Sequence, residues 1–306
     1  MNHWKTYKNG NYIVHINLLD GTRIRETEED DFVSDFATNI DMKATNYCDR
    51  NCEFCHEGSS KTGRHGDIMN EKFIETLHPY QELALGGGDI TSHPDLIPFL
   101  RKLKEKEIIP NITVHQQHFE QKQSLIRQLV DEGLIYGLGV SVSNPTPKFI
   151  ELVKQYPNAV LHVINGIFSV SDAKALSGHN LKLLILGYKH LRRGTEHFMK
   201  ERNTVLMNQN WLYNNLQSLF DKFAVVSFDN LALEQLGVKR LIPEKDWENY
   251  YAGDDGTSTF YIDTVERKFA KSSTANFGDR YDLLDSVDDM FQVIQNEFDV
   301  APPQKI

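Results

Sequence analysis

The chain has 306 residues, of which 40% are hydrophobic and 25% are charged, a balance typical of a packed globular protein. Its formal net charge of −10 argues against broad binding to nucleic acid or to an anionic membrane surface. No apolar run approaches the roughly 20 residues of a transmembrane helix, and the first residues lack the apolar core of a signal peptide. We therefore expect a cytoplasmic protein with no membrane partner.

The first 38 residues are expected to form an extension that precedes the main domain. Residues 11–26 alternate between apolar and polar side chains, and Asp20-Gly21 between the two halves is a strong signal for a tight turn. The pattern predicts an N-terminal β-hairpin within residues 1–38.

From residue 39 onward, short apolar runs alternate with longer amphipathic runs. The expected strands are residues 39–45, 82–87, 111–115, 136–143, 159–165 and 181–188, with helices such as 96–107 and 121–133 between them and a possible seventh strand at 223–228. Six βα units in succession indicate a parallel sheet with helices outside. The predicted fold class is α/β, a partial (β/α)6 TIM-type barrel over residues 39–240. Its active site would lie at the C-terminal ends of the strands.

The last part of the chain, residues 241–306, is expected to be an α+β extension. Residues 258–274 alternate around a polar centre and predict a second hairpin, and residues 285–298 predict a terminal helix. The final six residues are expected to form a loose end.

All three cysteines of the chain lie within eight residues, in the stretch CDRNCEFC. An odd, clustered set is not a secreted disulfide framework. A zinc ion would need a fourth ligand, either His56 directly after Cys55 or a distant residue, and an adjacent Cys-His pair suits one tetrahedral metal poorly. A [4Fe–4S] cluster takes four ligands, so three cysteines would leave one iron open to bind another molecule.

The spacing C-x3-C-x2-C, with Phe54 before the last cysteine, resembles the cluster motif of the radical SAM superfamily. The resemblance implies that Cys48, Cys52 and Cys55 hold a [4Fe–4S] cluster whose open iron binds S-adenosylmethionine. It also implies that the reduced cluster cleaves this cofactor to methionine and a 5′-deoxyadenosyl radical, which abstracts hydrogen from a substrate. An external one-electron donor, similar to flavodoxin or ferredoxin, would then be a partner.

A second stretch, LALGGGDITSHPDL at residues 83–96, resembles the Gly-Gly-Glu motif of the same superfamily. Gly87, Gly88 and Asp89 match that motif, and glycines allow the backbone to approach a ligand closely. The departures are Asp89 in place of Glu and Ile90 in place of Pro. The shorter carboxylate leaves two alternatives open, in which either Asp89 itself or a nearby backbone carbonyl holds the amino group of the cofactor.

Other parts of the resemblance concern the ends of the later strands. It implies a ribose contact at the fourth strand, an adenine contact at the fifth strand and backbone flanking adenine at the sixth. The matching residues are Ser141 and Ser143, then Asn165, then Tyr188.

Polar side chains in the loops after the strands are candidates for substrate contacts or, alternatively, ordinary polar groups at the barrel mouth. They are His115, Gln117, Lys189, His190, Arg192, Arg193, Asp229 and Asn230. For the basic cluster at 189–193 we weigh an anion site against a solvated loop, and the solvated loop is favoured.

The C-terminal hairpin resembles a segment of peptide- and protein-modifying radical SAM enzymes, except that Ala270, Lys271 and Ser272 stand where those proteins carry a cysteine. An auxiliary cluster with cysteine ligands is therefore excluded, because the chain has 3 cysteines in all. A peptide or protein substrate is slightly favoured over a nucleotide or small metabolite, and catalytic residues are not assigned. The alternatives are a non-catalytic protein that binds S-adenosylmethionine or a cluster for regulation or redox sensing, and a structural zinc module.

Overall fold

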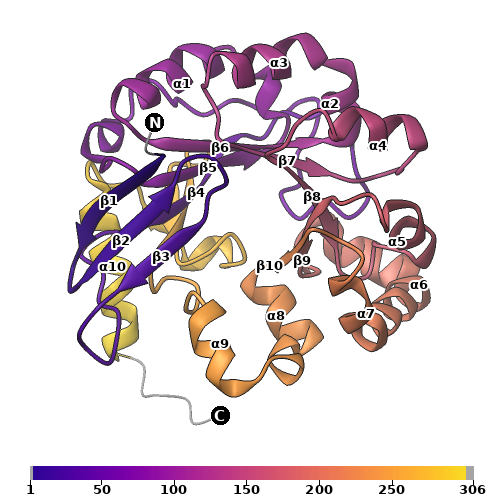
Figure 1. Cartoon of the computed structure of the whole chain (residues 1–306). Helices are drawn as coiled ribbons and strands as arrows, with labels where there is room; N and C mark the ends of the chain where they lie inside the picture. Colours follow the sequence, from indigo (N-terminus) through magenta and orange to yellow (C-terminus); the bar gives the residue numbers. More distant parts are fainter. Residues whose placement is uncertain (1–2, 301–306) are drawn as a thin grey trace.

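The computed structural model describes residues 3–300, and its main feature is a curved sheet of ten strands (Figure 1). The strand order is β10-β9-β8-β7-β6-β5-β4-β11-β12-β13. Every neighbouring pair from β10 to β11 is parallel, and the two last pairs are antiparallel. The order begins with β10 and ends with β13, so the sheet does not close, and the fold is a partial TIM-type barrel.

The strands of the barrel lie where the apolar runs predict them. They are β4 (Asn39–Thr45), β5 (Glu82–Gly87), β6 (Ile109–His115), β7 (Gly137–Ser141), β8 (Ala159–Ile164), β9 (Lys182–Leu186) and β10 (Val225–Phe228). The possible seventh strand is present as β10, so the number of parallel strands exceeds the six predicted. This strand was hard to count from sequence because only four residues form it.

Helices cover the outer face of the sheet, and some close the gap between its two edges (Figure 1). They are α1 (Leu96–Glu105), α2 (Gln116–Gln121), α3 (Gln123–Asp131), α4 (Pro147–Val153), α5 (Val170–Leu176), α6 (Arg193–Asn215), α7 (Gln217–Phe220), α8 (Asn230–Leu236), α9 (Glu244–Tyr250) and α10 (Val287–Val300). None of the helices within residues 3–300 is both long and apolar enough to cross a membrane.

The two faces of the sheet differ in burial, and β8 illustrates the difference. Leu161 and Val163 point outward and are buried under the helices, whereas Val160 and His162 point inward and stay partly exposed. This follows from the period of two in a strand, which sends alternate side chains to opposite faces. The main core therefore lies between sheet and helices, and the inner face lines an open lumen.

The helix expected at 121–133 is present as α3 (Gln123–Asp131), and the short helix α2 (Gln116–Gln121) precedes it with a break at Lys122. Lys122 has φ −109° and ψ 34°, which are not helical values, and it ends α2 and begins α3. Gly133 follows α3 closely and has φ +60°, as is common for a glycine just past the end of a helix. The break has a structural reason: it lets the Lys122 ammonium reach Asp89 on the neighbouring unit, at 2.7 Å.

The N-terminal extension is a three-stranded antiparallel sheet, one strand more than the predicted hairpin. Its strands are β1 (Trp4–Asn9), β2 (Tyr12–Asn17) and β3 (Arg23–Glu26), in the order β1-β2-β3. The predicted turn at Asp20-Gly21 joins β2 to β3, and Gly21 has φ +79°. This turn lies against the N-terminal ends of the barrel strands, where it helps to enclose a cavity of about 390 Å³.

The C-terminal segment contributes directly to the main sheet. The predicted hairpin is present as β11 (Thr259–Asp263) and β12 (Lys268–Ala270), followed by the short strand β13 (Tyr281–Asp282). Strand β11 pairs in parallel with β4, the first strand of the barrel, which the sequence did not reveal. The predicted terminal helix is α10, and the final six residues lie outside the described part of the chain.

Helix α10 packs into the same core as the barrel. Phe291 is 1% exposed, and its ring lies 6.2 Å from that of Phe260 on β11. Met290 and Ile294 on the same helix are fully buried. The division into segments 1–38, 39–240 and 241–306 stays a prediction, but apolar side chains of the last segment share one core with those of the barrel.

We expect Phe291→Ala to lower the free energy of unfolding by about 3–5 kcal/mol, because it leaves a cavity in this shared core. Urea unfolding followed by tryptophan fluorescence measures the effect. Gln292→Ala, at an exposed position one residue away, is the matched control and should change stability by less than about 0.5 kcal/mol. Equal stability of the two variants would contradict a shared core.

Candidate functional site

The three cysteines lie in the loop after β4, at the C-terminal end of the barrel strands. Cys48, Cys52 and Cys55 are free thiols, and each is partly exposed. The loop is compact, since Cys48 N–H donates to Ser60 O at 2.9 Å and Cys55 N–H donates to Cys52 O at 3.2 Å. Burial raises the pKa of Cys52 to about 11, and the other two thiols add to the shift. Three thiolates this close together repel one another. A cationic iron–sulfur cluster would offset this repulsion and favour the ionised form.

A single metal ion makes a different demand on its ligands. It needs three or four donor atoms that converge on one point. Within residues 3–300, no three His, Cys, Asp or Glu side chains are arranged closely enough to hold one ion. In a four-iron cluster each thiolate binds its own iron, so the sulfurs stand farther apart. The described residues thus offer no preformed site for a single zinc ion.

The glycine turn after β5 lies directly against the start of the cysteine loop. Gly88 N–H donates to Thr45 O at 2.8 Å, and Asp89 N–H donates to Tyr47 O at 2.7 Å. A Cβ atom on Gly88 would lie 2.1 Å from Tyr47 O, and one on Gly87 would lie 2.3 Å from Thr45 O. Gly87 also has φ +108°, which L-residues rarely adopt. Both glycines are thus required by backbone contact between the two motifs.

The Asp89 carboxylate is buried and is already paired. Its Oδ2 accepts a hydrogen bond from Lys122 Nζ at 2.7 Å, and its Oδ1 accepts from the backbone N–H and the hydroxyl of Thr91. His118 Nδ1 lies 3.4 Å from Oδ1. Asp89 is 4% exposed. Of the two alternatives for the amino group of the cofactor, this geometry favours a backbone carbonyl of the turn.

The basic cluster after β9 binds the main chain of the cysteine loop. Arg193 Nε donates to Cys52 O at 3.0 Å, and its Nη2 donates to Ser59 O at 2.9 Å. Arg192 donates to Glu57 O. The favoured interpretation of this cluster as a solvated loop is therefore wrong for the two arginines. Both guanidinium groups bind backbone carbonyl oxygens of the cysteine loop. Nothing in the sequence indicates this role.

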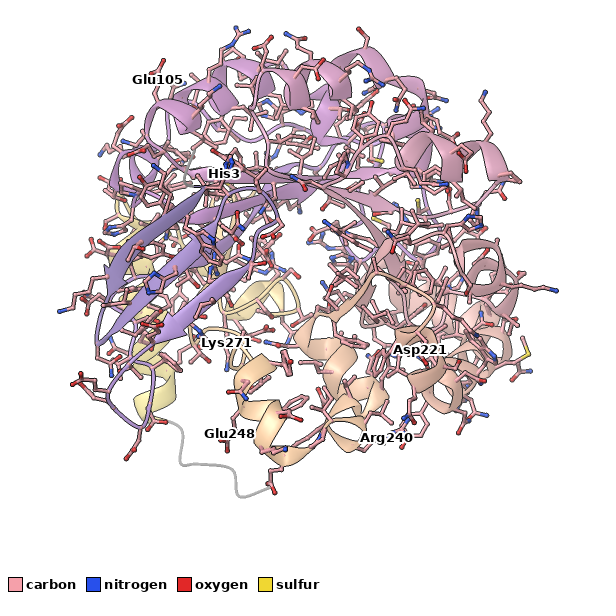
Figure 2. All side chains as sticks on the ribbon, in the orientation of Figure 1. His3, Glu105, Asp221, Arg240, Glu248 and Lys271 are labelled. Atoms are coloured by element: carbon pink, nitrogen blue, oxygen red, sulfur yellow. The ribbon has the colours of Figure 1, made fainter. Side chains whose placement is uncertain are left out.

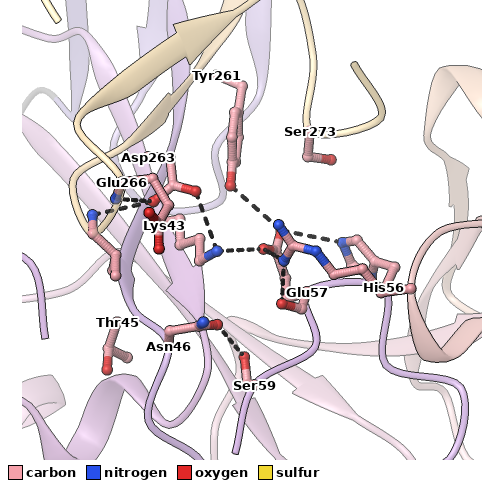
Figure 3. Close-up of polar contacts among 12 residues, drawn as sticks. Lys43, Thr45, Asn46, His56, Glu57, Ser59, Tyr261, Asp263, Glu266 and Ser273 are labelled. Atoms are coloured by element: carbon pink, nitrogen blue, oxygen red, sulfur yellow. Dashed lines mark hydrogen bonds and ion pairs between the residues drawn. The ribbon is translucent and has the colours of Figure 1, made fainter. Parts of the chain in front are cut away.

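A buried group of charged side chains joins the cysteine loop to the C-terminal hairpin (Figure 3). Lys43 Nζ lies 2.9 Å from Glu57 Oε2 and 3.2 Å from Asp263 Oδ2. Arg280 Nη1 is 3.4 Å from the same Asp263 oxygen, and the Tyr261 hydroxyl donates to Glu57 Oε1 at 3.4 Å. Two cations and two carboxylates thus neutralise one another in the interior, as buried charges require.

Sequence analysis missed this buried group. Burial would raise the pKa of Glu57, but His56 and Lys43 more than offset that effect and hold the pKa well below its usual range. The only available signal was Lys43 within an expected barrel strand, because a lysine is rarely buried without a partner. The partner on β11 lies 220 residues away in the chain and cannot be identified from the pattern.

The lumen contains three unusual titratable side chains, Asp41 on β4, His115 at the end of β6 and His162 on β8. Enclosure raises the pKa of Asp41 to about 6, and the carboxylates of Asp255 and Asp229 add to this shift against the effect of Lys189. Enclosure also lowers the pKa of both histidines to about 4, so both are neutral at pH 7.

The His162 ring occupies space left by a glycine on the neighbouring strand. A Cβ atom on Gly139 would lie 2.4 Å from His162 Cε1 and 2.8 Å from the Thr113 hydroxyl. By contrast, a Cβ atom on Gly86 would meet nothing within 4 Å. On the lumen side of the sheet there is therefore open space above Gly86 on β5. The space above Gly139 on β7 is filled by the His162 ring.

Of the predicted ribose contacts, Ser141 ends β7 and is partly exposed, and Ser143 lies two residues beyond it and is exposed. The backbone after β7 is held by Gln116, whose Oε1 accepts hydrogen bonds from Ser143 N–H at 3.0 Å and Asn144 N–H at 2.9 Å. Gln116 Nε2 donates to Asn144 O at 2.6 Å. Gln116 is 2% exposed, and its role in fixing this loop was not foreseen.

The predicted adenine contacts Asn165 and Tyr188 are joined through one side chain, Gln235. Its Oε1 accepts from Asn165 Nδ2 at 3.0 Å and from Tyr188 N–H at 2.9 Å, and its Nε2 donates to Tyr188 O at 2.9 Å. Asn165 is 1% exposed, and its Oδ1 has no hydrogen-bond partner within the described residues. A buried acceptor without a partner at this position fits an amino group such as that of adenine.

Phe54 and Tyr188 approach the same histidine from two sides. The Phe54 ring lies edge-on to His197 with 5.8 Å between centroids, and the Tyr188 hydroxyl lies 3.0 Å from His197 Nδ1. The same hydroxyl donates to Gly194 O at 2.8 Å. These contacts attach the cysteine loop to α6, so the Tyr188 side chain is structural, and only its backbone remains a candidate for ligand contact.

Comparison with known proteins identifies the fold. No protein-family model and no curated protein matches the sequence. The structure of Streptococcus suis SuiB bound to S-adenosylmethionine matches with TM-score 0.63 and 11% identity, over 100% of this chain and 91% of that one. SuiB bound to precursor peptide SuiA matches with TM-score 0.58 and 12% identity, over 89% of this chain and 82% of that one. The likeness confirms the predicted partial barrel.

We expect Gly88→Ala to loosen the cysteine loop and to lower the free energy of unfolding by about 1–3 kcal/mol, because the new Cβ collides with Tyr47 O. Thermal unfolding and the rate of thiol modification by Ellman's reagent, both on metal-free protein, measure the effect. Gly86→Ala is the control, since its Cβ enters open space. If the two variants behave alike, the contact between the motifs does not position the loop.

We expect Asp41→Asn to raise the melting temperature at pH 7.5 and to leave it nearly unchanged at pH 4. A folded-state pKa of about 6, above the unfolded value of about 3.9, means that wild-type stability falls as pH rises from 4 to 6. Asparagine has no carboxylate to ionise and removes that loss. Asp30→Asn at an exposed loop position is the control. The same gain at both pH values would contradict the raised pKa.

Proposed function

We propose that this chain is a radical SAM enzyme with one [4Fe–4S] cluster on Cys48, Cys52 and Cys55 and S-adenosylmethionine as its second cofactor. The main support is the direct contact between the cysteine loop and the glycine turn, on a fold shared with SuiB in a structure that holds S-adenosylmethionine. When bound, the reduced cluster supplies the electron that cleaves the cofactor to methionine and a 5′-deoxyadenosyl radical, which abstracts hydrogen from the substrate.

The protein side chains have distinct tasks in this proposal. Arg193 fixes the cysteine loop by binding Cys52 O, which keeps the thiols at the mouth of the barrel. The glycine turn brings backbone carbonyls to the cofactor. The Asp89 carboxylate forms an ion pair with Lys122 instead. The turn therefore binds through its main chain, which explains why Asp in place of Glu is compatible with cofactor binding.

The remaining cofactor contacts follow from the ends of the later strands. Ser141 and Ser143 are proposed to bind the ribose, with Gln116 fixing the backbone beneath them. Asn165 is proposed to accept a hydrogen bond from the adenine amino group through its unpaired Oδ1. Backbone at 187–188 would flank the base, and the Gln235 amide holds that backbone in place.

A peptide is the proposed substrate. SuiB has been crystallised with the precursor peptide SuiA, and the lumen of the present chain leaves space above Gly86. Asp41 and His162 face that lumen and are proposed to contact the peptide. With 3 cysteines in the chain, an internal relay cluster bound by cysteine is excluded, so an external flavodoxin- or ferredoxin-like protein in the cytoplasm would supply the electron.

A second candidate is a non-catalytic protein that binds S-adenosylmethionine or a cluster for regulation or redox sensing. The observation in its favour is the Asp89 carboxylate, which is committed to Lys122 and His118 and not free to bind the cofactor. The two candidates share the cysteine loop and differ only in whether the bound cofactor is cleaved.

Anaerobic reconstitution with iron and sulfide tests the proposal. We expect about four irons per chain, consistent with one [4Fe–4S] cluster, and 5′-deoxyadenosine from S-adenosylmethionine once dithionite is added. Cys52→Ala should lose this product to below about 1% of wild type, because one iron of the cluster loses its ligand.

Each other result selects a different candidate. Full cleavage by Cys52→Ala would refute the cluster assignment. Binding of S-adenosylmethionine without cleavage under strong reductant would favour the regulatory candidate. One zinc and no iron in anaerobically purified protein would favour a structural zinc module.

A further inference from the structure

The sheet ends at β10, which leaves one edge of this strand without a neighbouring strand in the described part of the chain. Ala224 N–H donates to Leu181 O at 2.8 Å, toward β9. Backbone groups alternate in direction along a strand, so those of Val225 and Ser227 point to the open side. The Val225 side chain is 47% exposed. An unpaired edge of this kind is a template for an added strand.

A groove of about 480 Å³ runs beside this edge, between β10, α8 and α9. Its volume lies within the range of about 300–1,000 Å³ that is typical of ligand sites. Aromatic side chains dominate its wall, and they are Phe220, Phe223, Phe228, Trp247, Tyr250 and Tyr251. Tyr250 is 78% exposed, and no residue of α9 is buried. Aromatic side chains that are exposed or partly exposed, as most of these are, are enriched at protein interfaces.

One rim of the groove, formed by residues 244–255, is acidic, whereas Lys239 and Arg240 follow Val238 elsewhere in its lining. Residues 244–255, which include α9, carry five carboxylates and one lysine. Glu248 is exposed on α9 at the outer side of the molecule (Figure 2). A partner that approaches this rim is therefore favoured if it carries lysine or arginine.

The groove shares part of its lining with the cavity at the N-terminal ends of the barrel strands. Val225 and Ser227 line it on one side and also line the cavity of about 390 Å³ at the N-terminal ends of the barrel strands. A strand bound on β10 would thus lie at the open seam of the sheet, next to the lumen.

We propose that β10 and this aromatic groove bind an extended segment of the substrate peptide, with apolar side chains in the groove and basic side chains at the rim. This inference rests on the proposed function, because it takes a peptide as the substrate. A second copy of the chain fits less well, because pairing two β10 edges would bring two acidic 244–255 segments together.

The test selects peptides from a random dodecapeptide library displayed on phage, using the full-length protein without reductant. We expect enrichment of peptides with alternating apolar residues beside lysine or arginine. Affinities of the synthesised, fluorescein-labelled peptides are then measured by anisotropy. Trp247→Ala with Tyr250→Ala should weaken binding at least about tenfold, and Phe277→Ala, at an exposed aromatic residue of the C-terminal segment, should not.

A proline at position 225 tests strand addition itself. Val225→Pro removes an outward N–H without removing a hydrogen bond to β9, so we expect weaker peptide binding. If Val225→Pro also lowers the melting temperature, its weaker binding is not interpreted. The Trp247→Ala, Tyr250→Ala variant then tests the proposal. No enriched peptide, unchanged binding by the groove variants, or a dimer that Val225→Pro dissociates would overturn the proposal. Since binding is measured without cofactor cleavage, absence of 5′-deoxyadenosine would refute only the proposed function.

Discussion

Two main-chain hydrogen bonds between the glycine turn and the residues before Cys48 are the contact on which the candidate site depends. They join Gly88 to Thr45 O and Asp89 to Tyr47 O, and they require an approach that no side chain tolerates. Because both partners are backbone atoms, the cysteine loop is placed relative to β5 with little freedom. The two sequence motifs are therefore two halves of one structure, which explains why their succession along the chain is more informative than either motif alone.

The same loop is held on its other side by charge. Lys43 lies between Glu57 of the loop and Asp263 of the C-terminal hairpin, so a shift of either segment would leave a buried carboxylate unpaired. Breaking a buried pair of this kind generally costs several kcal/mol. The hairpin is thus part of the support of the site, although it stands outside the βα repeat. Arg193 completes the support from the side of α6.

Local patterns in the sequence predicted most of the barrel and the position of the cysteines. Strands β4 to β9 follow from apolar runs of period two, and the open turn at Gly87 follows from residue type. The errors in the C-terminal segment and around Asp89 share one cause, since each involves a partner remote in sequence. Parallel pairing of β11 with β4 leaves no periodic signal, and neither does the bond from Lys122 that breaks a helix and occupies Asp89. Residue type alone cannot show that an arginine binds carbonyl oxygens in another loop.

An incomplete barrel has consequences for how a substrate is recognised. In a closed barrel, layers of branched side chains fill the interior, and ligands bind only at the loops above the strands. Here the inner face carries Gly86 with open space above it, and the sheet stays open at β10. In the proposal above, the open edge at β10 is a second binding place besides the mouth of the barrel. Such an opening suits a long, flexible ligand, because a part of it can bind the edge while another part lies in the lumen beside the cysteine loop.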